Sequence, residues 1–85
     1  MASYRLLIKP SAASELDDLP LKDRKRVIAK IQRLGSDPRP AGAEKLSGQE
    51  KYRLRQGDYR VLYAIDDPGA TVVVVRIAHR REAYR

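Results

Sequence analysis

The sequence contains no cysteine, one histidine and no long apolar run. Without cysteine the chain forms neither a disulfide nor a thiolate zinc site, and a single histidine cannot build a metal site alone. The longest aliphatic run, Val72 to Val75, is far too short to span a bilayer. The first residues, Met1 to Arg5, lack the apolar core of a signal peptide. We therefore expect a cytoplasmic protein that needs no metal or cofactor and has no membrane partner.

Several motifs of enzyme chemistry are also absent. The chain has no Gly-rich phosphate loop, no recognisable pair of carboxylates, no His/Cys metal spacing and no nucleophile elbow. If the protein is an enzyme, its chemistry must use Arg, Lys, His, Tyr or Glu.

The charge of the chain is strongly one-sided. Eighteen Lys and Arg stand against eleven Asp and Glu, which gives a net charge of +7 and a pI near 10.1. Such a balance favours a polyanionic partner such as nucleic acid, an acidic protein or an anionic membrane surface. In residues 45–85, seven of the nine basic side chains are Arg. The planar guanidinium suits bidentate contact with phosphate oxygens.

The hydrophobic pattern predicts helices in the first half of the chain. Residues 4–8 read as a strand that Pro10 stops, and Ser11 is the expected N-cap of a first helix. Pro20 separates it from a second helix whose apolar positions recur at helical spacing up to Leu34. Residues 35–50 are expected to be loop.

The pattern changes to a period of two after residue 50. It predicts three strands, 51–55, 59–65 and 71–78, joined by tight turns. The last strand is apolar on both faces, so we expect it to be central and covered by the helices. The fold class is α+β: a single domain, 1–85, of order β-α-α-β-β-β with a short C-terminal tail or helix, in which an antiparallel meander packs against a helical hairpin.

Arginines gather on one hairpin of this predicted sheet. Alternation puts Arg53 and Arg55 on one face of their strand, and the hairpin returns with Arg60 beside them. A solvated, aggregation-resistant strand face and an anion-binding site both fit this pattern. Near the C-terminus, His79 is the one side chain whose ordinary pKa lies near neutrality, and Tyr84 could stack on a base or dock on the domain.

Several different short motifs are spread over nearly the whole chain. They are Pro10-Ser11-Ala12, Leu19-Pro20, Asp37-Pro38-Arg39-Pro40, Lys45-Leu46-Ser47-Gly48, the block Tyr52-Arg53-Leu54-Arg55-Gln56-Gly57-Asp58-Tyr59-Arg60-Val61-Leu62-Tyr63, and the tail His79-Arg80-Arg81-Glu82-Ala83-Tyr84-Arg85. With these motifs the sequence resembles the RelE family of the RelE/ParE toxin superfamily. The resemblance implies a toxin of a type II toxin–antitoxin pair that cuts mRNA in the ribosomal A site. It also implies a RelB-like antitoxin as partner in a hetero-oligomeric complex.

The resemblance also implies roles for individual residues. Arg53 and Arg55 match basic residues at the scissile phosphate, and Arg60 matches a phosphate-binding arginine. Arg80 matches an arginine near the leaving oxygen, and Tyr84 matches a tyrosine that stacks on the substrate base. The expected catalytic residues are Arg53, Arg55, Arg60, His79, Arg80 and Tyr84, and the expected RNA-binding residues are Lys45, Lys51 and Arg81.

The implied reaction is attack of a 2′-OH on the adjacent phosphate, which needs a base, charge stabilisation and an acid. Arginines stabilise charge well but hardly deprotonate, so they serve poorly as the base. The candidates for that role are His79, Lys51, Lys45, Glu50 or ribosomal RNA, with His79 preferred for its pKa.

Three functions remain open at this point. The first is a ribosome-dependent mRNA endonuclease, and the second is a ParE-like toxin that binds DNA gyrase without cutting RNA. The third is a weakly active protein whose main role is to pair with its antitoxin.

Overall fold

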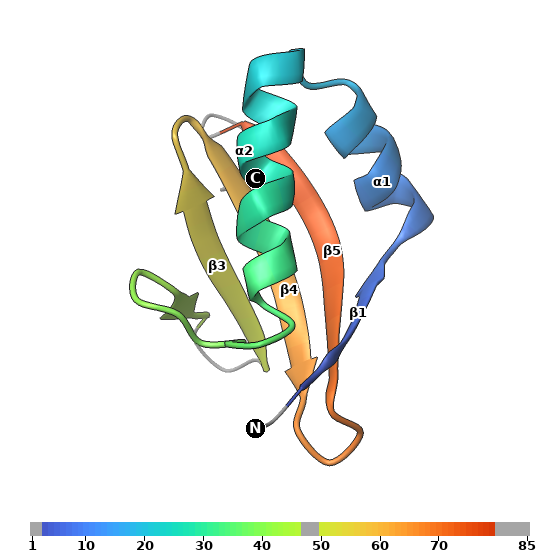
Figure 1. The fold of residues 1–85 in the computed structure, drawn as a ribbon, viewed down its shortest axis with the longest axis vertical. Helices are drawn as coiled ribbons and strands as arrows, with labels where there is room; N and C mark the ends of the chain where they lie inside the picture. Colours follow the sequence, from blue (N-terminus) through green and yellow to red (C-terminus); the bar gives the residue numbers. More distant parts are fainter. Residues whose placement is uncertain (1–2, 47–49, 80–85) are drawn as a thin grey trace.

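The computed structural model describes residues 3–46 and 50–79 of the chain (Figure 1). Strand β1 (Arg5–Ile8) leads into helix α1 (Pro10–Asp17) and helix α2 (Leu21–Arg33). Strands β2 (Glu44–Lys45), β3 (Lys51–Gln56), β4 (Tyr59–Asp66) and β5 (Thr71–His79) follow. Neither described helix is long and apolar enough to cross a membrane.

The five strands form one sheet in the order β1-β5-β4-β3-β2. The β1–β5 pair is parallel, and the other three pairs are antiparallel. In Figure 1 both helices lie on the same side of this sheet. The predicted α+β class, the helical hairpin and the meander of β3, β4 and β5 are therefore confirmed.

The core lies between the helices and the sheet. Val27 and Leu34 from the α2 region meet Val61, Val72 and Val74 from the sheet, and all five are fully buried. Burial of this much aliphatic surface is the main driving force for folding. As predicted, β5 is an interior strand of the sheet, because β1 and β4 pair with its two edges.

Three local predictions were wrong. Ser11 does not cap α1. The helix begins at Pro10, two residues earlier than a Ser11 cap would give, because proline fits the first helical position. The N-cap is Lys9, which makes no side-chain cap bond. The segment 35–50 is not all loop, since the short β2 pairs with β3 at the sheet edge. The last strand runs one residue further than predicted, to His79, and the predicted tail or helix beyond it lies outside the described residues.

A β-bulge in β5 changes which side chains face the helices. Leu62 pairs with Arg76 whereas Tyr63 pairs with Val74, so Val75 is an extra residue on β5. Before the bulge Val74 faces the core, and after it the buried Ile77 does. The bulge therefore moves every residue after Val75 to the face opposite the one that simple alternation predicts.

Candidate functional site

Three arginines share the sheet face that points away from the helices, which we call the arginine face. On β3, Tyr52 and Leu54 are buried in the core, so the alternating Arg53 and Arg55 point to the other side. Arg60 on β4 lies directly opposite Arg55 in the strand register, and opposite residues of an antiparallel pair point the same way. The grouping predicted from the sequence is thus present in the fold.

The turn between β3 and β4 sets this register. Gly57 and Asp58 form a two-residue connection, and Gly57 has φ of 61°. A positive φ at the first central position and not at the second is typical of a type II′ turn, whose twist matches that of the flanking strands. The turn therefore places Arg55 and Arg60 opposite each other.

The three arginines differ in exposure. Arg55 is exposed, the Arg53 side chain is 16% exposed, and Arg60 is only 6% exposed. A guanidinium stays charged at all physiological pH values, so this face concentrates positive charge partly shielded from water. Such a surface attracts anions more strongly than a fully solvated one, because the local dielectric is lower.

Glu44 is a residue of this face that the sequence analysis missed. It pairs with Arg53 in the β2–β3 register, and its Oε2 accepts a hydrogen bond from Arg53 Nη2 at 3.0 Å. A two-residue strand has too few positions for a period to be recognised, so no signal in the sequence marks it.

The two predicted RNA-binding lysines of this region lie on different faces. Lys51 alternates with Arg53 and is exposed on the arginine face. Lys45 is paired with the core residue Tyr52, so it lies toward the helix side, where its Nζ is 3.6 Å from Glu50 Oε1. The structure thus brings Lys51, but not Lys45, to the arginines.

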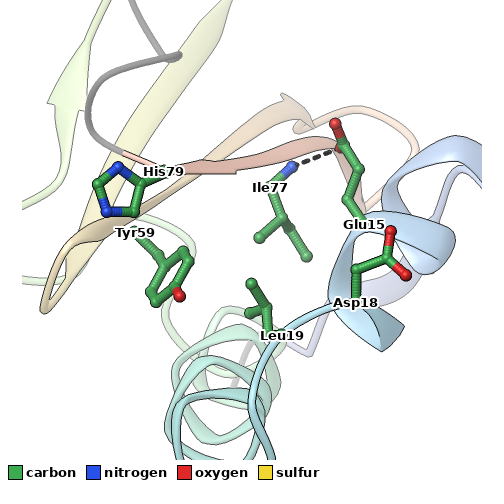
Figure 2. A pocket seen from close by; sticks show the side chains of 6 residues that line it. All are labelled: Glu15, Asp18, Leu19, Tyr59, Ile77 and His79. Atoms are coloured by element: carbon green, nitrogen blue, oxygen red, sulfur yellow. Dashed lines mark hydrogen bonds between the residues drawn. The ribbon is translucent and has the colours of Figure 1, made fainter.

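His79 lies on the helix side of the sheet, away from the arginine face. It is opposite Tyr59 in the β4–β5 register, with ring centroids 5.6 Å apart and the rings perpendicular. Figure 2 shows both rings lining a pocket of about 400 Å³, and the other lining residues are Glu15, Asp18, Leu19 and Ile77. The geometry therefore does not place the preferred base beside the arginines.

Glu15 connects the wall of this pocket to the sheet. Its Oε1 accepts a hydrogen bond from the Ile77 backbone N–H at 2.9 Å (Figure 2). Its Oε2 lies 3.6 Å from Arg76 Nε. No group of three His, Asp or Glu in residues 3–46 and 50–79 is arranged to hold a metal ion. Arg80, Arg81 and Tyr84 lie outside the described residues.

A polar network holds the loop that leads from α2 to β2. Arg39 donates to Asp67 through both terminal nitrogens, at 3.2 and 2.8 Å, and through Nε to the Tyr52 hydroxyl at 3.0 Å. Tyr4 donates to the same carboxylate at 2.6 Å. These bonds from Arg39 and Tyr4 lower the pKa of Asp67, and the bond to Asp67 raises the pKa of Tyr4.

The comparison with known proteins matches this architecture. The family profile described as "ParE toxin of type II toxin-antitoxin system, parDE" matches residues 6–84. This chain belongs to the RelE/ParE toxin family of type II toxin–antitoxin systems. Its resemblance to that family, inferred from the motifs, is confirmed.

Individual relatives support the same assignment. The chain is 34% identical over 84 residues to Toxin RelE of Mycobacterium tuberculosis, covering 96% of this chain and 87% of that toxin. The toxin–antitoxin complex RelBE2 of the same organism has 30% identity, a TM-score of 0.80, and coverage of 92% of this chain and 99% of that one. The archaeal RelE–RelB complex of Pyrococcus horikoshii has 28% identity, a TM-score of 0.84, and coverage of 95% and 99%. Members of the RelE/ParE family thus share this fold, and related structures are toxin–antitoxin complexes.

Proposed function

We propose that this RelE/ParE-family toxin is a ribosome-dependent mRNA endonuclease of the cytoplasm that inhibits translation. The observation that carries the proposal is the gathering of Arg53, Arg55 and Arg60 on one sheet face, with Arg60 largely shielded from water. Three guanidiniums on one sheet face suit a phosphate whose negative charge increases in the transition state. The 34% identity to a toxin named RelE supports the same activity.

In the proposed reaction the 2′-oxygen forms a bond to phosphorus while the bond from phosphorus to the 5′-oxygen breaks. The products are a 2′,3′-cyclic phosphate and a 5′-OH, and the proton lost by the 2′-OH is balanced by the one gained by the leaving oxygen. The arginines stabilise the charge on the phosphoryl oxygens. Of the candidate bases named from the sequence, Lys51 lies on the arginine face. Ribosomal RNA is another candidate base, and positioning by the ribosome is a separate source of rate enhancement.

A second candidate is inhibition of DNA gyrase without RNA cleavage, as in a ParE-like toxin. The matching family profile carries the ParE description, which favours this alternative. The arginine face distinguishes the two functions, because a toxin that cuts no RNA does not need three arginines on one sheet face.

The two functions can be separated in one experiment. The toxin is added to a translating extract, mRNA is mapped by primer extension, and gyrase supercoiling is measured in parallel. Cuts at A-site codons with normal supercoiling support the endonuclease. Blocked supercoiling without cuts would refute it in favour of the gyrase inhibitor.

The proposed partner is a RelB-like antitoxin in a hetero-oligomeric complex. The relatives solved as RelB–RelE complexes support this partner. With +7 of net charge on the toxin, an acidic antitoxin segment over the arginine face would be attracted at long range.

A further inference from the structure

Glu44 brings a negative charge to a face that otherwise gathers positive charge. In the β2–β3 register it lies directly opposite Arg53, so the two side chains point to the same side of the sheet. Their atoms Oε2 and Nη2 are 3.0 Å apart. Because an acidic residue at a phosphate-binding surface opposes the substrate's charge, its presence there needs a reason other than affinity.

The two members of this ion pair are shielded to different degrees. The Arg53 side chain is 16% exposed, whereas that of Glu44 is 57% exposed. The carboxylate thus lies at the edge of the face, and the guanidinium lies inside it. A guanidinium is a rigid planar fork of five N–H donors, so its orientation decides which oxygens it can contact.

The segment that carries Glu44 is itself held in place. On its N-terminal side the Ala43 N–H donates to the Pro40 carbonyl at 3.0 Å, and on its C-terminal side the Leu46 N–H donates to the Lys51 carbonyl at 2.8 Å. Further back, Arg39 fastens the loop to Asp67. The Glu44 carboxylate is therefore supported by an anchored backbone, as a group that orients another side chain must be.

We propose that Glu44 is a positioning residue for RNA cleavage: its carboxylate holds the Arg53 guanidinium in the orientation that the scissile phosphate requires. This inference rests on the function proposed above. Loss of the carboxylate leaves the charge of Arg53 intact but removes one of the bonds that orient its guanidinium, so the chemical step suffers. It also removes a negative charge from an RNA-binding face, so RNA binding does not weaken.

The test is steady-state cleavage of a short mRNA on programmed ribosomes by the wild type, Glu44→Ala and Glu44→Gln. In Glu44→Ala kcat is expected to fall by roughly tenfold to a hundredfold while KM stays equal or decreases. Glu44→Gln is expected to lie between, because its amide oxygen can still accept from Arg53. Asp17→Ala is the matched control: it changes net charge equally on an exposed position of α1 and is expected to match the wild type.

The possible outcomes separate this inference from the proposed function. If the wild type makes no cuts, both are overturned. If the wild type cuts and Glu44→Ala has an equal or higher kcat, or a higher KM alone, only the positioning role is overturned. Thermal unfolding midpoints of all variants are measured alongside. Because the Glu44 carboxylate is exposed, its loss is expected to move them by less than about 4 °C. If Glu44→Ala unfolds, the kcat of Glu44→Gln decides by the same criteria.

Discussion

His79 lies opposite Tyr59 across the β4–β5 ladder, with ring centroids 5.6 Å apart, and both rings face the helices. A general base contributes roughly 10²–10⁴-fold to a rate. Because His79 is on the far side of the sheet from Arg60, we expect His79→Gln to change kcat by less than about tenfold. The pH–rate profile of cleavage between about pH 5.5 and 7.5 (about one unit either side of the ordinary histidine pKa) should keep its shape. A hundredfold loss with an altered profile would restore His79 as the base.

The pairing of Arg55 with Arg60 predicts a conflict between stability and activity. Like charges directly opposite on two strands destabilise a sheet, by roughly 0.2–1 kcal/mol. We expect Arg55→Gln to raise the free energy of unfolding by about that amount, measured by urea denaturation, while mRNA cleavage falls by a hundredfold or more. Arg26→Gln, at an exposed position of α2, removes the same charge and should change neither. Full cleavage by Arg55→Gln would show that the arginine face does not bind the phosphate.

Gly57 is expected to be intolerant of substitution because of its backbone conformation. With φ of 61°, a Cβ is strained there whatever space surrounds it. Gly57→Ala should lower the free energy of unfolding by about 1–2 kcal/mol. Gly35→Ala is the control: its φ is not positive, and an added Cβ would lie 3.5 Å from its nearest neighbours, an ordinary contact. Equal stabilities of the two variants in urea would contradict the turn assignment.

The buried hydroxyl of Tyr63 is expected to make the fold less stable at alkaline pH. It donates to the Pro38 carbonyl at 2.8 Å, and burial raises the pKa of Tyr63 to about 12. Since the folded pKa is above the unfolded value of about 10, the stabilisation is complete below pH 10 and is lost as pH rises through 12. Tyr63→Phe should cost about 1–3 kcal/mol at pH 7 and remove that alkaline loss. Absorbance titration of the phenolate measures the pKa of Tyr63, and urea denaturation at several pH values measures the free energy of unfolding.

Asp67 is expected to make the stability of the fold depend on pH in the acid range. Its pKa is lowered in the folded state, so its stabilisation is present above the unfolded value of about 3.9 and is lost as pH falls through the folded pKa. Asp67→Asn should therefore be less stable than the wild type at pH 7 and should lose less stability below about pH 4. If the free energies of unfolding of the two proteins change in parallel as the pH falls from 7 to below about 4, the Arg39–Asp67 contact contributes nothing to stability.

Residue patterns were sufficient for most elements of the fold. The helical spacing of Val27, Ile31 and Leu34 predicts the buried side of α2, and the alternation from Tyr52 to Arg55 predicts which arginines share a face. These patterns depend on local periodicity, which the backbone geometry imposes directly. The two-residue β2 had no such period, so Glu44 could not be foreseen.

Charge, periodicity and short motifs were enough to predict the α+β class, the family and the arginines on one hairpin. Which of the candidate residues lie together depended on how the strands pair in the folded sheet. Strict alternation from Val72 and Val74 would put His79 on the arginine face, but the extra residue Val75 reverses the alternation and turns His79 toward the helices. A bulge depends on the register between two strands, and that register is a property of the assembled sheet rather than of either strand alone.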